Sequence, residues 1–338
     1  MILLKTFDNK FDFSVFESKA RPDQLQGTDM EKLAECAGRI CYDSFGTGRS
    51  SQDWHEHVLN VRHLSIYEHC WFCIDDNYYS EEEINMEHVS SGGIRFIERP
   101  DYPVSSIEFN ARFALEHKYD FMLPVLEKYM PNVLKAARAA KLPISDRKTP
   151  NYDVGPFGLS DNWATLLLDM SRGCSHEIVR HGDNTAISQR STRYVDESKP
   201  SDEELGCEPK ALSSCPSNCV LIPPFSFDDP TLAENINSIL EDNFKSCMEN
   251  YLKLKQLFKE YNESNNNSNS NSKTFTTKVV NGLARLVLPH NLRTEMVFSA
   301  EREQWKHMIN MRTSPGADQE IRRLFSEIQK VLDRNFSS

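Results

Sequence analysis

The sequence predicts a mixed α/β (α+β) fold in which long helices pack against a sheet. Three segments support this fold class. The segment from Trp163 to Asp169 is a nearly continuous apolar run, as in a strand buried on both faces. Charged and apolar residues recur at helical spacing over 29–42. Between Asp229 and Tyr261, apolar residues keep to one face of a long helix, so this stripe is expected in the core or at a subunit interface.

The N-terminal half alternates strand and helix patterns. The apolar start of the chain predicts an edge strand, and Cys70 to Asp75 predicts another strand. Pro, Gly, Asp and Asn between Leu142 and Leu159 predict a loop. Helices are expected over 29–42, 51–62, 110–116 and 121–141.

The C-terminal half is expected to be mostly helical. An acidic stretch with Pro and Ser, 196–219, predicts a surface excursion. The Asn/Ser-rich segment 262–273 cannot bury enough apolar surface to order itself, so it predicts a disordered insertion. A helix over 277–288 is stopped by Pro289. Helix is also expected over most of 293–336, with a break near Ser314-Pro315-Gly316.

Composition narrows the function. The chain has 338 residues and a formal net charge of -11, which argues against a general binder of nucleic acid or of an anionic membrane. Its apolar runs are too short for a signal peptide or a membrane span. Nine scattered cysteines, without a secretion signal, predict reduced thiols and a cytoplasmic protein.

No metal site is expected. Cys70 and Cys73 have the spacing of a zinc or redox pair, but in an apolar strand adjacent residues face opposite ways. The segment from His63 to His69 does not match the spacing of a His-Glu-x-x-His helix. His55 and His57 are expected on an exposed helix.

A cationic run is the most informative stretch of the chain. Between Cys174 and Tyr194, the side chains of Arg180, His181, Arg190 and Arg193 stand among hydroxyl and amide groups. Arginine offers phosphate a planar fork of donors, and Ser and Gln add neutral hydrogen bonds. A cradle for a phosphorylated small molecule is therefore expected, although a solvated helix end remains the plainer alternative.

Another group of residues that could contact a ligand lies near the C-terminus. Trp305, Met308 and Arg312 share a helical face, and an arginine beside aromatic and imidazole groups can contact a planar ring. An apolar stripe with ordinary surface charges is the alternative. The sequence contains no Walker loop and no Gly-rich dinucleotide fingerprint, so any nucleotide would bind without the usual Rossmann turn.

Taken together, these stretches resemble the flavin-dependent thymidylate synthase family. The matching motifs are Arg180-His181, Ser191-Thr-Arg193-Tyr194, Arg172 to Val179, His63 to His69, Ala284 to Pro289, Thr294-Glu295 and Trp305 to Arg312. The resemblance implies one catalytic domain over 1–338 with a largely antiparallel sheet, and an insertion or lobe at 76–162. It also implies a homotetramer with shared active sites. The implied reaction converts dUMP to dTMP with FAD, NADPH and methylenetetrahydrofolate.

The resemblance also implies roles for individual residues. Ser65, Arg180, His181, Gln189 and His307 would contact FAD. Arg312 would be catalytic, facing the uracil and stabilising negative charge at its N3 side. The residues expected to bind dUMP are Glu177, Arg180, Gln189, Ser191, Arg193 and Arg285.

The chain departs from the family pattern at several positions. Gly182 or Asp183 stands where the motif has its second arginine, and Glu301 and Glu303 stand where the family has Asn and Arg. Gly282 replaces an acidic residue before Ala284-Arg285. Two alternatives therefore stay open: a flavin enzyme acting on another pyrimidine nucleotide, and a nucleotide-binding homologue without turnover.

Overall fold

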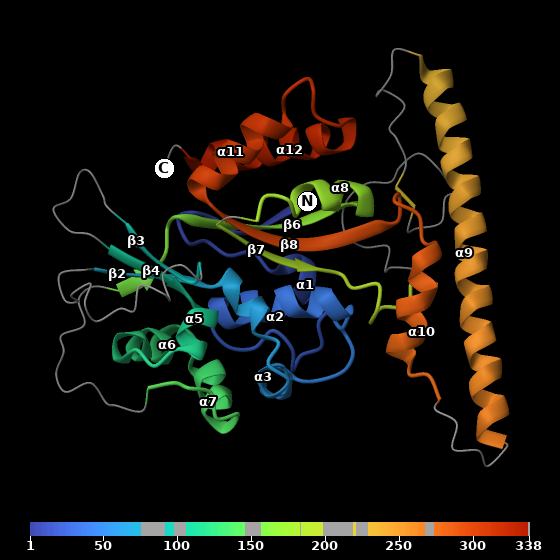
Figure 1. Cartoon of the computed structure of the whole chain (residues 1–338). Helices are drawn as coiled ribbons and strands as arrows, with labels where there is room; N and C mark the ends of the chain where they lie inside the picture. Colours follow the sequence, from blue (N-terminus) through green and yellow to red (C-terminus); the bar gives the residue numbers. More distant parts are fainter. Residues whose placement is uncertain are drawn as a thin grey trace.

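Two four-stranded antiparallel sheets form the framework of the protein (Figure 1). Every strand pair in both sheets is antiparallel, which confirms the mixed, antiparallel fold class. The computed structural model describes residues 1–75, 92–97, 106–145, 157–182, 184–198, 219–220, 229–267 and 274–336.

The first sheet has the order β1 (Ile2–Lys5), β6 (Trp163–Ser171), β8 (Arg293–Glu301), β7 (Thr185–Gln189). β1 lies at an edge and β6 lies inside, as predicted. The prediction of helix was wrong for β8. This segment pairs with β6 along its whole length, from Trp163↔Glu301 to Ser171↔Arg293, and such long-range pairing overrides a weak local pattern.

Helices cover both faces of this sheet (Figure 1). Alternate side chains of β6 and β8 enter one hydrophobic core with α8 (Arg172–Ile178), α11 (Arg302–Arg312) and α12 (Gln319–Phe336). Leu167 and Val297 point the other way, into the core built around α2 (Asp29–Tyr42). The break predicted near Ser314-Pro315-Gly316 separates α11 from α12.

The N-terminal helices have clear start signals. Thr28 and Glu31 form a capping box at the start of α2, and Ser50 caps α3 (Ser51–Asn60). The prediction that His55 is exposed was wrong: only 2% of it is accessible, and its Nδ1 lies 3.0 Å from the Tyr67 hydroxyl. His55 follows Trp54 on the inner face of α3, whereas His57 lies on the outer face.

The second sheet has the order β3 (Ile94–Ile97), β4 (Ser106–Asn110), β2 (Trp71–Asp75), β5 (Phe157–Leu159). The loop predicted up to Leu159 therefore ends in a short strand. The helix expected over 121–141 is broken at Pro131, which begins a new helix. The surrounding helices are α1 (Ser14–Glu17), η1 (Leu64–His69), α5 (Ala111–Glu116), η4 (Asp120–Met122), α6 (Leu123–Tyr129) and α7 (Pro131–Ala139).

The two sheets meet at a pair of stacked indoles. The rings of Trp71 and Trp163 lie 4.0 Å apart, and the guanidinium of Arg95 lies over both. Side chains from the described part of 76–162 pack in the same core as α2 and α3. The hypothesis that 76–162 is an insertion or lobe stays a prediction.

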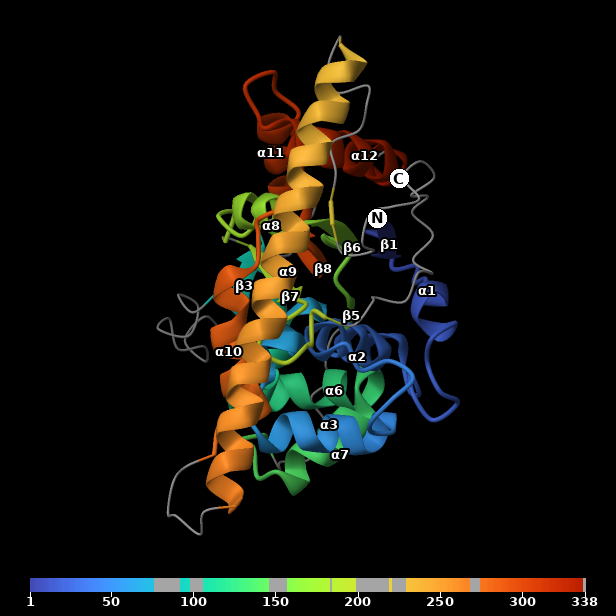
Figure 2. The same cartoon turned by 90° about the vertical axis from the view of Figure 1, so that its right-hand side faces the viewer.

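A long helix runs along one side of the molecule. α9 (Pro230–Asn267) packs beside α10 (Thr277–Ala284), as both views show (Figures 1 and 2). It also contacts η6 (Arg285–Val287). Because α9 continues to Asn267, the first half of the segment expected to be disordered is helical; 268–273, like most of the acidic stretch 196–219, lies outside the described residues. In the part of the chain that the structure describes, no helix has the length and apolarity needed to cross a membrane.

Candidate active site

Arg312, at the end of α11, is held against the end of α8. Its Nε donates to Nε2 of His181 at 2.9 Å. Its other two nitrogens donate to the Glu177 carboxylate at 3.2 Å and to the Glu177 carbonyl at 3.0 Å. With 14% of its side chain exposed, Arg312 is a largely buried, oriented cation.

His181 is the acceptor in this arrangement, so its Nε2 carries no proton. Burial, followed by the nearby charges of Arg312 and His307, lowers the pKa of His181. The rings of His181 and His307 are 6.3 Å apart and nearly perpendicular. The neutral imidazole therefore positions the guanidinium and at the same time lies against His307.

Arg180 is the exposed member of the group. Its side chain is 69% exposed and pairs with Glu177 at 2.9 Å. Glu177 thus faces two guanidinium groups, Arg180 and Arg312, and leaves a local excess of positive charge. Such an excess suits an anionic ligand.

Gln189 ends β7 and lies between α8 and β8. Its amide donates to the hydroxyl of Ser175 at 2.8 Å and to that of Thr294 at 3.3 Å. Arg172 also donates to Thr294, at 3.3 Å. The pKa of Arg172 is lowered by burial and, to a smaller extent, by the nearby cation Arg285, so Arg285 lies within electrostatic reach of this group.

The turn after β7 carries Ser191 and Arg193. The amide of Ser191 donates to the carbonyl of Cys41 at 3.1 Å, which ties the turn to α2. Arg193 is exposed, with its guanidinium 5.7 Å from the ring of Tyr194. Buried Arg190 anchors this turn to the protein interior, because it pairs with buried Glu197 at 2.7 Å.

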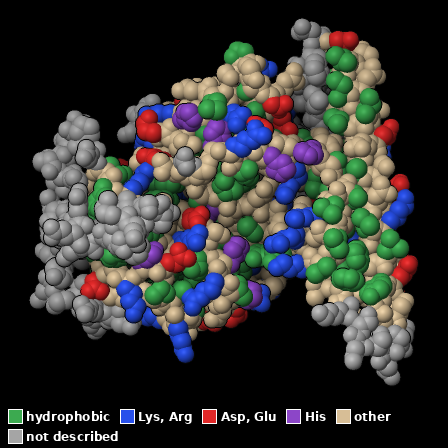
Figure 3. All heavy atoms as spheres, viewed as in Figure 1, with side chains coloured by type: hydrophobic (Ala, Val, Ile, Leu, Met, Phe, Trp, Pro, Cys, Tyr) green, Lys and Arg blue, Asp and Glu red, His purple; other side chains and the backbone are tan. Residues whose placement is uncertain are grey.

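The predicted site residues thus fall into connected groups. Glu177, Arg180, His181, His307 and Arg312 gather at the ends of α8 and α11. Gln189 joins α8 through Ser175. Figure 3 shows basic and histidine side chains on this face, over α8 and in the hollow toward α10. Ser65 lies on η1, which packs against β7, and is partly buried.

Three residues that hold this site were not assigned roles from the sequence: Arg172, Ser175 and Thr294. All three lie within motifs that resemble the family, and this resemblance is the sequence feature that could have identified them. The sequence does not show that they hydrogen-bond to one another and to Gln189, because these contacts depend on the antiparallel pairing that brings Thr294 opposite Met170, two residues before Arg172.

The two glutamates that depart from the family pattern are both paired. Glu301 forms an ion pair with Arg95, and Glu303 pairs with Lys306 at 2.7 Å. Arg95 also pairs with buried Glu108 from β4. The charge of Glu301 therefore links the two sheets.

Among the described residues, no group of three or more His, Cys, Asp or Glu side chains is arranged to hold a metal ion. The described cysteines are free thiols, and Cys70 is buried, with its Sγ near the carbonyl of Met30.

Comparison with known proteins adds an independent line of evidence. A flavin-dependent thymidylate synthase of Mycobacterium marinum is 30% identical over 182 residues, which cover 53% of this chain and 62% of that protein. The enzyme of the same name from Mycobacterium avium is 29% identical over the same shares. The chain thus spans less than two thirds of the length of these relatives. A crystal structure of thymidylate synthase X from Helicobacter pylori with FAD and dUMP is similar at a TM-score of 0.32 and 20% identity, over 50% of this chain and 67% of that one.

A family model described as "Thymidylate synthase complementing protein" matches residues 162–336. This region is just over half of the 338 residues and contains all the predicted site residues except Ser65. The match confirms the family resemblance that the motifs carry. The chain belongs to the thymidylate synthase complementing protein family.

Proposed function

We propose that this protein is a flavin-dependent thymidylate synthase, which converts dUMP to dTMP with FAD, NADPH and methylenetetrahydrofolate. The observation that carries the proposal is the oriented guanidinium of Arg312, fixed by Glu177 and neutral His181. A cation held rigidly at a site edge stabilises charge that develops on a bound ring without having to reorganise.

In this proposal Arg312 is the catalytic residue. It would face the uracil and stabilise negative charge as the N3 side of the ring becomes anionic. Its three hydrogen bonds to Glu177 and His181 remove the freedom of a long side chain, so less entropy is lost when the substrate binds.

The nucleotide would lie between the end of β7 and η6. Exposed Arg193 and Arg285 would bind its phosphate, with Ser191 as a neutral donor. Gln189 has an amide already oriented by two hydroxyls and would contact both nucleotide and flavin. Glu177 and Arg180 complete the proposed substrate contacts.

FAD would be held by Ser65, Arg180, His181, Gln189 and His307. These side chains fit the group, because guanidinium, imidazole, hydroxyl and amide groups suit a pyrophosphate and a polar ring edge. The pairing of Glu301 with Arg95 and of Glu303 with Lys306 also supports the fit, since neither carboxylate is left unpaired to repel a phosphate. When bound, FAD would supply the hydride that completes the methyl group, after recharging by NADPH.

A homotetramer with shared active sites and a cytoplasmic location are part of the proposal. The exposed apolar side chains on α9 and α10 support subunit contact, because a lone chain would leave them in water. These side chains are Leu232, Ile239, Leu257, Val279 and Leu283.

The proposal is tested with the purified full chain, FAD, NADPH, methylenetetrahydrofolate and dUMP. A flavin absorption spectrum and formation of dTMP are expected, with neither DNA nor membrane needed. A protein that stays colourless after incubation with FAD, and that makes no dTMP, would contradict the proposal. Light scattering tests the tetramer separately.

A second candidate is turnover of another pyrimidine nucleotide. It is favoured by Gly182, where an added Cβ atom would meet no heavy atom of the described residues within 4 Å, whereas the family motif carries a bulky arginine nearby. Comparing kcat/KM for dUMP, dCMP and UMP separates the candidates. Tight dUMP binding without reduction of FAD by NADPH would instead favour a homologue that lacks turnover.

A further inference from the structure

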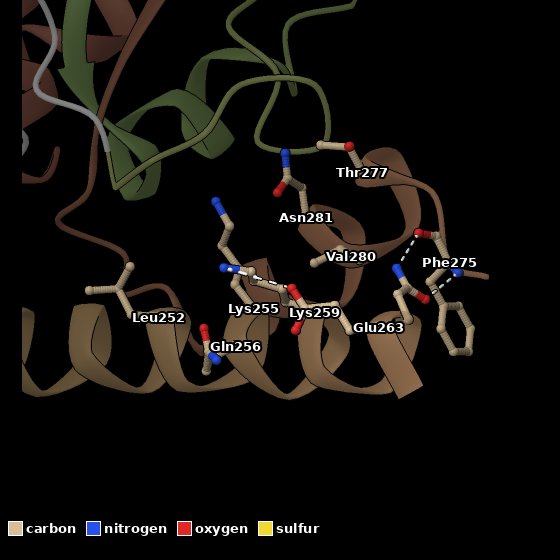
Figure 4. A pocket seen from close by; sticks show the side chains of 10 residues that line it. Leu252, Lys255, Gln256, Lys259, Glu263, Phe275, Thr277, Val280 and Asn281 are labelled. Carbon is tan, nitrogen blue, oxygen red and sulfur yellow. Dashed lines mark hydrogen bonds and ion pairs between the residues drawn. The ribbon is translucent and has the colours of Figure 1, made fainter. Parts of the chain in front are cut away.

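A groove of about 460 Å³ lies between α9 and α10, apart from the residues assigned to the nucleotide and flavin. α9 contributes Lys255 and Lys259, and α10 contributes Asn281. Figure 4 shows these polar side chains reaching into the space from the two helices. Apolar contact is available from Leu252 and Val280 at the sides.

Asn281 is the unusual member of this lining. It is 1% exposed, and neither Nδ2 nor Oδ1 has a hydrogen-bond partner among the described residues. Buried amides in native proteins are normally paired, because an unpaired one loses its hydrogen bonds to water. A primary amide both donates and accepts, so its best complement is a second amide group.

The lysines add a preference for an anion. Lys259 lies 4.0 Å from Glu263, and both side chains are more than 60% exposed, so this pair is weak and its ammonium is available. Lys255 is held by Asp196 at 2.6 Å. Lys278, at the near end of α10, lies 4.9 Å from the ring of Tyr194. A carboxylate near Lys259 with an amide at Asn281 would satisfy both features.

The groove is close to the candidate active site. Asn281 precedes Arg285 by four residues, a rise of about 6 Å along a helix, so the two positions are on neighbouring turns of one face. Asp196, the partner of Lys255, follows Arg193 by three residues. A ligand bound beside the nucleotide, next to Arg193 and Arg285, can therefore extend into the groove.

We propose that this groove binds an extended ligand in which carboxylates alternate with amide groups, namely a short glutamyl chain. The chemical class follows from the amide of Asn281 and the ammonium of Lys259. Its source rests on the proposed function, because the folate co-substrate ends in glutamate joined through an amide. The groove would then hold the tail of that co-substrate while its ring system lies at the active site.

The test uses triglutamate, linked through its γ-carboxylates, as the probe and calorimetric titration of the full chain as the measurement. Lys259→Gln and Asn281→Leu are each expected to weaken binding about tenfold, the loss of one good interaction. Lys253→Gln is the matched control, because it removes the same charge from an exposed position of α9 that does not line the groove. Affinity is expected to stay unchanged in this control.

A thermal measurement separates a ligand contact from a structural role. Asn281→Leu removes an unpaired buried amide, so its Tm is expected to equal or exceed that of the wild type while binding weakens. A lower Tm together with unchanged binding would show that Asn281 serves the fold and would overturn the proposal.

The proposal would also be overturned if the wild type did not bind triglutamate, or if Lys253→Gln lost as much triglutamate affinity as Lys259→Gln. A change in oligomeric state in Asn281→Leu would overturn it as well, because it would mean that a second copy of the chain covers the groove. Titration with dUMP in the same samples keeps this proposal separate from the proposed function. Loss of triglutamate binding in Lys259→Gln and Asn281→Leu, with dUMP binding intact, supports the proposal for the groove. Triglutamate binding by a wild-type protein that forms no dTMP contradicts only the proposed enzymatic function.

Discussion

Arg312 donates its Nε proton to Nε2 of His181 across 2.9 Å, so a largely buried guanidinium of the candidate site depends on a neutral imidazole. Two residues separated by 131 positions are joined in this way. The contact forms because β6 and β8 pair in full register and lead directly into α8 and α11. Protonation of the His181 ring is therefore coupled to the orientation of the Arg312 guanidinium.

The first prediction concerns pH. Since the pKa of His181 is lowered in the folded protein, the unfolded chain binds this proton more readily, and its contribution to stability is lost as the pH falls from the ordinary histidine range through the folded pKa. Protonation also removes the acceptor for Arg312. We expect kcat/KM to fall on the acid side with this pKa. In His181→Gln, whose carbonyl can still accept, the acid limb from this group should flatten, and an unchanged pH profile would contradict this coupling.

The second prediction concerns Arg193. Because its side chain is exposed and lies on a turn fixed by Arg190 and Glu197, Arg193→Ala should leave Tm unchanged. Its affinity for dUMP should fall about tenfold or more, the loss expected for one charge-assisted contact to phosphate. Lys245→Ala, at an exposed position of α9, is the control. Equal dUMP affinity in Arg193→Ala and the wild type would remove Arg193 from the phosphate site.

The local pattern predicted much of this fold, and its failures have a common cause. Apolar periodicity placed α2, α3, β6 and α9, because each shows its buried face within a few turns or residues. β8 was missed, since its strand character comes from neighbours more than a hundred residues away. The exposure of His55 was predicted wrongly because a single histidine in a helical segment does not reveal whether it lies on the exposed face or, like Trp54, on the buried face.

The site shows the same division. Motif resemblance selected Glu177, His181 and Arg312, and the structure joins all three. The sequence could not indicate that Glu301 pairs with Arg95, because that contact depends on how the second sheet packs against the first. A residue that departs from a family motif is thus explained by a partner from a distant strand.

The third prediction tests that explanation. Glu301→Gln keeps the size of the side chain but removes the charge opposite Arg95, and both side chains are mostly buried. The free energy of unfolding should fall by about 1–3 kcal/mol, as for loss of a charged hydrogen bond. Glu303→Gln, whose carboxylate is 71% exposed, should change it by less than about 0.5 kcal/mol. Urea unfolding of both variants makes the comparison, and equal stability would mean that Glu301 does not link the sheets.

The fourth prediction concerns Arg312 itself. In Arg312→Ala, Glu177 keeps its pair with Arg180 and His181 gains access to water, so no buried charge is left unpaired and Tm should change little. The value of kcat should fall about 10²–10³-fold, as for loss of a preorganised group that stabilises developing charge. Arg312→Lys should recover only part of this loss, because an ammonium cannot reach His181 and both acceptors of Glu177 with a planar fork. Steady-state rates at saturating dUMP, with dUMP affinity measured separately, distinguish this role from binding. A variant that keeps most of its kcat but binds dUMP weakly would make Arg312 a binding residue and would assign stabilisation of the ring to another group.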